Sequence, residues 1–138
     1  MTTYYAVIDT NVLVSAVLKA DSVPGRLMEL VFDGPIAPVL DRGILGEYRA
    51  VLSRPKFSLT PEIVSDILAR FEEKGLFVDA EPSELELPDP KDRVFYEVVL
   101  EKRKEGDAYL VTGNMKHFPA EPFIVTPRQM LELVLSDV

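Results

Sequence analysis

Short apolar segments alternate with longer amphipathic segments along the whole chain. This pattern predicts strands joined by helices, and so a mostly parallel sheet with helices on both faces. Residues 4–8 (YYAVI) and 108–112 (AYLVT) are largely apolar, as central strands buried on both faces are. We therefore expect a three-layer α/β/α protein with a Rossmann-like sheet of about five strands. The other strand candidates are residues 35–40, whose prolines weaken the prediction, 76–80 and 123–126.

Several of the predicted helices begin at residues that favour helix ends. Residues 42–52 and 61–74 have the periodicity of amphipathic helices, and Gly75 is a typical helix end. The capping residues are Asp41 before residues 42–52, Thr60 followed by Pro61, and Thr126 with Gln129, a capping box that opens a final helix. The other helix candidates are residues 12–18, 24–32 and 94–104.

Length and composition restrict the class of protein and the kind of metal site. A chain of 138 residues without repeats or a linker is expected to form a single domain over residues 1–138. With no cysteine and one histidine, it offers no thiolate or histidine-cluster site, so any metal must be held mainly by oxygen. The longest apolar run, residues 12–18, is too short to span a membrane. Without a secretory signal pattern, we expect a cytoplasmic protein.

The net charge of −8 argues against broad, non-specific binding of duplex nucleic acid, which requires a basic face. It does not exclude nucleic acid as a substrate, because a metal bound by a carboxylate cluster inverts the local field. Solubility alone is an equally simple explanation of the excess acid. The charge therefore favours no single function.

Acidic residues recur next to the predicted strands and helices, and each also has a structural explanation. Asp9 closes the first strand, where it could cap a helix, although Thr10 and Asn11 could do the same. Glu47 lies at the edge of the apolar face of its helix, from which a glutamate reaches water easily. Asp92 is placed to cap the helix that follows it, and Asp89 reads as an ordinary loop acid.

A second predicted strand ends in polar residues, Thr112 and Asn114. In open parallel sheets, ligands bind outside the carboxyl ends of the strands, near the point where strand order reverses. We expect Asp9 and Asn114 at neighbouring strand ends, with Glu47 and Asp92 on flanking helices. Carboxylates crowded in this way repel one another, and a divalent cation such as Mg²⁺ or Mn²⁺ relieves the repulsion.

Four segments of the chain, in this order, resemble the PIN-domain family: VIDTNVLVSA, ILGEYRAVLSRPKF, LPDPKDRVFYEV and AYLVTGN. The resemblance covers essentially the whole chain and is greatest to small prokaryotic PIN proteins described as toxin components of toxin–antitoxin systems. It implies a PIN-like fold and a metal-dependent endoribonuclease that cuts single-stranded RNA. The acidic positions of the family fall on Asp9, Glu47, Asp92 and, where this chain departs from the pattern, Asn114. Asn11 and Thr112 match its supporting polar positions.

The resemblance also implies a mechanism and partners. Asp9, Glu47 and Asp92 would hold one Mg²⁺ or Mn²⁺, which activates water for attack on phosphorus. The amide oxygen of Asn114 can still ligate a metal or accept a hydrogen bond from a metal-bound water. It carries no charge, so a second metal site would be weaker. An antitoxin protein would block the site, and a homodimer is implied as well. The basic residues that we expect to contact RNA phosphates are Arg54, Lys56 and Lys116.

Two other functions remain open from the sequence. One is a PIN-like module that binds RNA or a protein partner with little or no cleavage, as the change at Asn114 suggests. The other is an aspartyl-phosphate phosphatase or receiver-like domain, with Asp9 as the phosphoacceptor and Thr112 and Lys116 as phosphate ligands. Those phosphatases usually carry a second acid two residues after the first, where this chain has Asn11. For His117 we expect a surface or loop-anchoring role.

Overall fold

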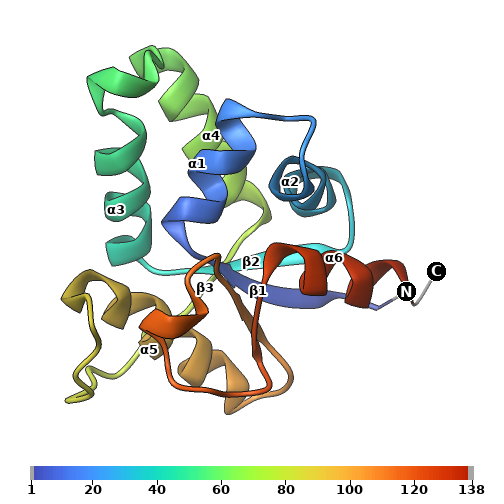
Figure 1. Cartoon of the computed structure of the whole chain (residues 1–138), viewed down its shortest axis with the longest axis vertical. Helices are drawn as coiled ribbons and strands as arrows, with labels where there is room; N and C mark the ends of the chain where they lie inside the picture. Colours follow the sequence, from blue (N-terminus) through green and yellow to red (C-terminus); the bar gives the residue numbers. More distant parts are fainter. Residues whose placement is uncertain (1, 137–138) are drawn as a thin grey trace.

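The computed structural model describes residues 2–136 and has one sheet of five parallel strands, in the order β3-β2-β1-β4-β5 (Figure 1). The expected α/β/α fold class is confirmed. The strands are β1 (Tyr4–Ile8), β2 (Ile36–Leu40), β3 (Leu76–Phe77), β4 (Tyr109–Val111) and β5 (Ile124–Val125). The helices are α1 (Thr10–Leu18), α2 (Val23–Asp33), α3 (Arg42–Leu52), α4 (Pro61–Lys74), α5 (Arg93–Arg103) and α6 (Pro127–Leu135), with 3-10 helices η1 (Pro55–Phe57), η2 (Pro90–Asp92) and η3 (Met115–His117).

Strand β1 lies at the centre of the sheet, between β2 and β4. Ala6 pairs with Pro38 of β2 on one side and with Tyr109 of β4 on the other. The chain builds outward from β1 to β2 and β3, and then crosses back to place β4 on the other side of β1. The strand order therefore reverses between β1 and β4, and the crevice for a ligand in such a sheet is expected beyond their carboxyl ends.

Strand β3 is much shorter than the sequence predicts. Of residues 76–80, only Leu76 and Phe77 pair, with Val39 and Leu40, and both are exposed at the edge of the sheet. Val78 still donates a backbone hydrogen bond to Leu40, after which the chain leaves the sheet. Because β3 reaches only the end of β2, Pro38 has no β3 residue opposite it, and its missing N–H is tolerated there.

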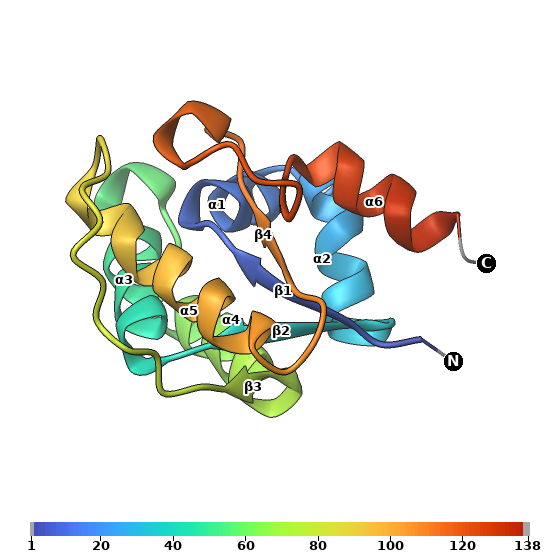
Figure 2. The ribbon, with the colours of Figure 1, turned by 90° about the horizontal axis from the view of Figure 1, so that it is seen from below.

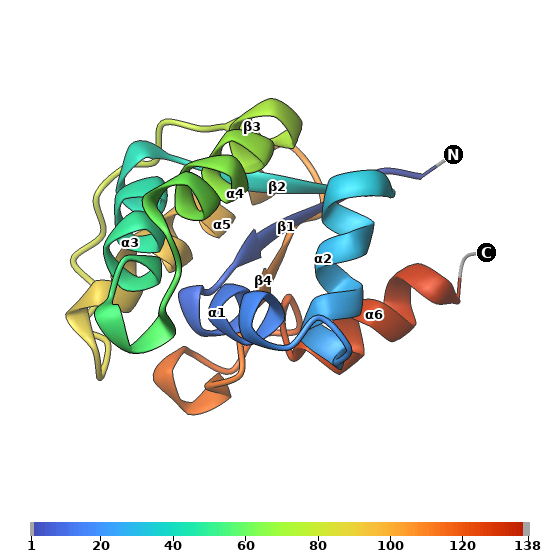
Figure 3. The same ribbon diagram turned by 90° about the horizontal axis from the view of Figure 1, so that it is seen from above.

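Helices cover both faces of the sheet (Figures 2 and 3). Helix α5 lies on one face, where it contacts β1, β2 and β4. Helices α1, α2 and α4 lie on the other, and α6 packs against α2. The core fills the space between the layers, and Ala6, Val7 and Ile8 of the central strand are fully buried in it. Burial of apolar side chains from both faces accounts for the unbroken apolar run in this strand.

The expected helix caps are confirmed. Asp41 accepts a 2.8 Å hydrogen bond from the backbone N–H of Ile44, and Thr60 caps α4 in the same way. Thr126 and Gln129 form both hydrogen bonds of a capping box. Gly75 ends α4 for a different reason from the expected one: its backbone is not left-handed, but an added Cβ would lie 2.5 Å from Leu40 and from the Phe71 carbonyl.

A membrane-spanning helix needs a long apolar stretch. None of the helices formed by residues 2–136 has the length and apolar character needed to cross a bilayer.

Candidate active-site cleft

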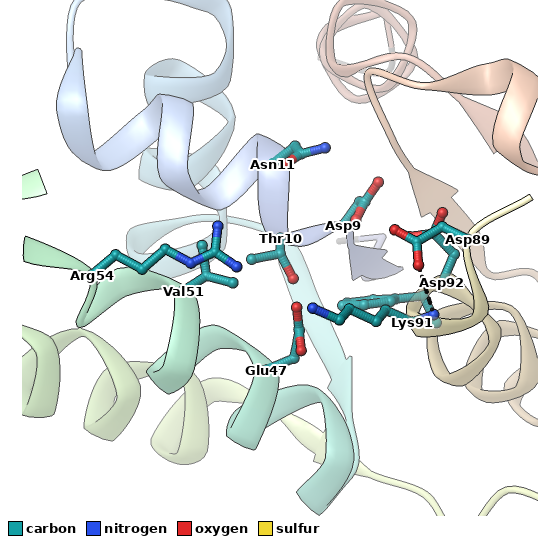
Figure 4. A pocket seen from close by; sticks show the side chains of 10 residues that line it. Asp9, Thr10, Asn11, Glu47, Val51, Arg54, Asp89, Lys91 and Asp92 are labelled. Carbon is teal, nitrogen blue, oxygen red and sulfur yellow. Dashed lines mark hydrogen bonds between the residues drawn. The ribbon is translucent and has the colours of Figure 1, made fainter. Parts of the chain in front are cut away.

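A polar cleft of about 170 Å³ opens where β1 ends, beside the point at which strand order reverses (Figure 4). Its residues come from the start of α1, from α3 and the turn after it, and from the η2–α5 segment. Segments far apart in the sequence thus meet beyond the carboxyl end of the central strand. The lining residues are Asp9, Thr10, Asn11, Glu47, Val51, Arg54, Asp89, Lys91, Asp92 and Phe95.

Asp9 follows β1 directly and is almost completely buried, with 4% of its surface exposed. Its backbone N–H donates to the Val111 carbonyl, which continues the β1–β4 pairing by one residue. Although Asp9 occupies the N-cap position of α1, its carboxylate does not cap the helix. It accepts a 2.7 Å hydrogen bond from the hydroxyl of Thr112 instead. The Asp9 side chain therefore does not have the capping role that the sequence allowed.

The environment of Asp9 disfavours its charged form. Burial raises the pKa of Asp9 above the ordinary value of 3.8, the Thr112 hydrogen bond lowers it, and the charge of Asp92 raises it again. The net result is a raised pKa. A buried carboxylate with a second acid nearby is a typical feature of functional sites, because a bound cation stabilises the charge that burial penalises.

Asp92 lies at the end of η2, immediately before α5, and is also buried. It makes no side-chain capping bond, and its Oδ2 lies 3.1 Å from Nδ1 of His117. Burial raises the pKa of Asp92, the His117 hydrogen bond lowers it, and the charges of Asp89 and Glu47 raise it. His117 thus anchors η3, as a loop-anchoring role requires, but its partner is a carboxylate of the cleft. No spacing pattern in the sequence indicates this contact between His117 and Asp92.

Helix α3 presents Glu47 to the cleft, and Tyr48 fixes the position of that helix. The Tyr48 hydroxyl is fully buried and donates a 2.5 Å hydrogen bond to the carbonyl of Ile8, one residue before Asp9. Burial and the charge of Asp9 raise the pKa of Tyr48, so the phenol stays protonated and remains a donor. Glu47 is half-buried, at the edge of the apolar face as expected, and forms no ion pair with any described residue.

The polar residues after β4 differ in how closely they approach the cleft. Thr112 is fully buried and its hydroxyl is shared, since it donates to Asp9 and accepts from the backbone N–H of Asn114 at 3.0 Å. Asn114 is half-buried and lies next to the strand end, but its side chain is not among those that line the cleft. Asn11 does line it, from the first turn of α1 (Figure 4).

Two cations line the cleft, and only one of them was predicted. Arg54 and Lys91 approach it from the α3 and η2 sides, respectively (Figure 4). Lys56 and Lys116 do not line it, and Lys56 lies 5.1 Å from the ring centre of Phe57. Lys91 falls between two acids in the segment PDPKD, and that clustering was the signal available in the sequence.

The sequence model of a family described as PIN domain matches residues 5–116. The chain belongs to the PIN-domain family. PIN domains are generally nucleases, which are hydrolases, and typically use divalent metals. The match includes every residue that lines the cleft. No curated protein matches the sequence.

The cleft of this PIN domain offers oxygen donors, the chemistry that hard divalent cations prefer. The buried Asp9 and Asp92 carboxylates are joined there by Glu47 and by the amide of Asn11. The hydroxyl of Thr10 is buried and has no hydrogen-bond partner. An orphaned polar atom beside acids with raised pKa values fits a site whose ligand completes the polar contacts.

Across residues 2–136, no three acidic or histidine side chains of this PIN domain are grouped closely enough to hold an ion together. Mg²⁺ usually keeps several waters and is bound through one or two carboxylates. Asp9 and Asp92 therefore fit a hydrated ion, whereas Glu47 would need to approach or act through water. The donor set suits a divalent cation without being fully assembled around one.

Proposed function

We propose that this PIN domain is an endoribonuclease that uses Mg²⁺ or Mn²⁺ to hydrolyse phosphodiester bonds of single-stranded RNA. The observation that carries the proposal is the pair of buried carboxylates, Asp9 and Asp92, in one cleft at the reversal of strand order. Two buried carboxylates destabilise the folded protein unless a partner stabilises their negative charge. Membership of the family favours a divalent cation as that partner.

In this proposal Asp9 and Asp92 hold the ion and Glu47 is the third ligand. When bound, the ion supplies a Lewis acid that makes water more acidic and offsets charge on the phosphodiester. Thr112 keeps one oxygen of Asp9 in place, and His117 does the same for Asp92. Asn114 stays a proposed supporting position, which supplies an amide rather than a fourth charge.

Substrate binding in this proposal depends on the two cations of the cleft. Arg54 and Lys91 flank acids that would otherwise repel a phosphate chain. Lys56 and Lys116, which lie outside the lining, are proposed as contacts to phosphates farther along the strand. A single strand is the favoured substrate because the net charge of −8 leaves little basic surface for a duplex.

The decisive experiment is a cleavage assay on unstructured and structured RNA with Mg²⁺, Mn²⁺ or EDTA. We expect cleavage of the unstructured RNA that depends on metal, and loss of it in Asp9→Asn, which keeps the shape of the side chain but removes its charge. The matched control is Asp107→Asn, an exposed acid before β4, at the opposite end of that strand from the cleft. Wild-type activity in Asp9→Asn, or equal loss in both variants, would refute the proposal.

A role as the toxin of a toxin–antitoxin pair extends the proposal to a biological function. It rests on the similarity of the sequence to small prokaryotic PIN toxins and includes an antitoxin partner and a homodimer. We expect expression of the wild type, but not of Asp9→Asn, to arrest growth of a host cell, and a small adjacent gene to restore growth. Equal growth with both forms would contradict the toxin role and leave the nuclease proposal intact.

One observation favours a second candidate, a PIN-like module that binds RNA or a protein partner without cutting. No three of the described acids are grouped to hold an ion. A Mn²⁺ titration separates the candidates, because a site without affinity for Mn²⁺ cannot support metal-dependent hydrolysis. The phosphatase or receiver alternative has less support, since the Thr112 hydroxyl is already donated to Asp9 and Lys116 does not line the cleft.

A further inference from the structure

The first residue of α1, Thr10, carries a polar atom that nothing in the described protein satisfies. The residue is 5% exposed, and its Oγ1 is buried without a hydrogen-bond partner. A buried hydroxyl left unpaired destabilises the folded state, because it has lost its hydrogen bonds to water without replacing them. Native proteins keep few such groups, and each calls for an explanation such as a ligand or a change of state.

The orphaned hydroxyl is aimed into the cleft. Figure 4 shows it pointing toward the carboxylate of Glu47, which reaches the cleft from α3. No hydrogen bond joins the two side chains, and Glu47 has no ion-pair partner among the described residues. An unused donor therefore points toward an acceptor that forms no ion pair among the described residues.

The three acids of the cleft also differ in how firmly their side chains are held. Asp9 and Asp92 are each held by a hydrogen bond, from Thr112 and from His117. Glu47 has no such restraint, and half-burial at the edge of α3 leaves its long side chain room to rotate. The acid that lacks a fixed position is the one opposite the unsatisfied hydroxyl.

We propose that Thr10 is a positioning residue, whose hydroxyl donates to the Glu47 carboxylate when a divalent cation draws that carboxylate into the cleft. This inference rests on the proposed function, and it adds a role for a residue next to Asp9. In the metal-free protein the hydroxyl is unpaired and destabilising. In the loaded protein it orients the third acid, as outer-shell donors orient the ligands of other metal sites.

The test uses Mn²⁺ as the probe and measures two quantities for each purified variant. Calorimetric titration gives the affinity for Mn²⁺, and thermal unfolding in EDTA gives the stability of the metal-free protein. Thr10→Val removes the hydroxyl and keeps the shape, so we expect roughly 10- to 100-fold weaker binding of Mn²⁺ with an unchanged or higher melting temperature. Thr10→Ser keeps the hydroxyl, so we expect near-normal affinity and a lower melting temperature.

A double variant asks whether Thr10 acts through Glu47. We expect Thr10→Val to weaken Mn²⁺ binding no further in a Glu47→Ala background, because its partner is already gone. Additive losses would mean that the hydroxyl acts directly on the ion, its water or a phosphate, and would overturn the positioning role. Wild-type affinity in Thr10→Val would overturn it as well, as would a variant that loses both stability and affinity.

The outcomes also separate this inference from the proposed function. A wild-type protein with no affinity for Mn²⁺ overturns both. If the wild type binds Mn²⁺ but cuts no RNA, the nuclease proposal fails while the Thr10 result still decides the positioning role. If the wild type binds and cuts and Thr10→Val binds equally well, only the positioning role fails.

Discussion

The hydroxyl of Thr112 donates a 2.7 Å hydrogen bond to the carboxylate of Asp9, although 103 residues separate them in the sequence. The bond joins the ends of β4 and β1 at the reversal of strand order. It gives the buried Asp9 a fixed orientation and partly offsets the effect of burial on its pKa. The properties of this carboxylate therefore depend on a residue from the far end of the chain.

Removing this hydrogen bond should impair the site without removing an acid. In Thr112→Val we expect a further rise in the pKa of Asp9, because the bond favours the ionised form, and roughly 10- to 100-fold weaker binding of Mn²⁺. The acid limb of the pH dependence of binding should move to higher pH. Thr112→Ser retains the donor and is the control. Calorimetric titrations of both variants over a range of pH test the prediction, which fails if valine and serine behave alike.

The stability of the metal-free protein should depend on pH through Asp9. The folded-state pKa of Asp9 lies above 3.8. Between the unfolded and folded pKa values, the folded protein therefore keeps a proton that the unfolded chain has already released. The stabilisation from this proton is fully present below the unfolded pKa and is lost as pH rises through the folded pKa. We therefore expect Asp9→Asn to raise the melting temperature in EDTA at neutral pH by a few degrees. Thermal unfolding beside Asp107→Asn measures this, and a lower melting temperature in Asp9→Asn contradicts it.

His117 should strengthen metal binding through its contact with Asp92. Its Nδ1 lies 3.1 Å from Oδ2 of Asp92, and the contact lowers the pKa of that carboxyl. In His117→Ala we expect about 10-fold weaker binding of Mn²⁺. His117→Asn places an amide donor near the same position and should recover part of the loss. Unchanged affinity in His117→Ala would reduce the contact to an anchor for η3.

Position 114 tests the contribution of the one neutral residue at an otherwise acidic position. Asn114 follows Thr112 beside the Asp9 strand end, so a carboxylate there adds negative charge next to the cleft. We expect Asn114→Asp to increase the affinity for Mn²⁺ several-fold and to raise the rate of RNA cleavage. Calorimetry and the cleavage assay check this. If neither quantity rises, position 114 does not belong to the metal site.

Arg54 and Lys91 should contribute to RNA binding through charge. For single strands, each phosphate contact adds about 0.7 to the slope of log affinity against log salt concentration. We expect Arg54→Gln and Lys91→Gln each to weaken binding of a short RNA and to reduce that slope by about this amount. Lys19→Gln, at an exposed lysine after α1, is the control. Fluorescence anisotropy at several salt concentrations measures the slopes, and equal slopes in all variants exclude direct phosphate contacts.

The local features of the fold could be predicted from the sequence because they depend on neighbouring residues. A helix cap needs only a side chain that accepts a hydrogen bond from a backbone N–H three residues on, so it does not depend on what the helix packs against. The residues that cap helices in this way are Asp41, Thr60 and Thr126. The apolar run of β1 likewise indicated a central strand. The length of β3 was not predictable, because it depends on how far β2 extends beside it.

The sequence by itself determined the order of strands and helices, the family, and which acids follow a strand or precede a helix. From local pattern alone, Asp9 and Asp92 could each be a helix cap or a site residue, and the cap was the simpler interpretation. Only the tertiary structure decided that neither carboxylate caps a helix and that Thr112 and His117 hold them instead. It also brought Lys91 and the orphaned Thr10 hydroxyl into the cleft. The reason is physical: burial and hydrogen-bond partners across a parallel sheet are set by strand order, which no local pattern encodes.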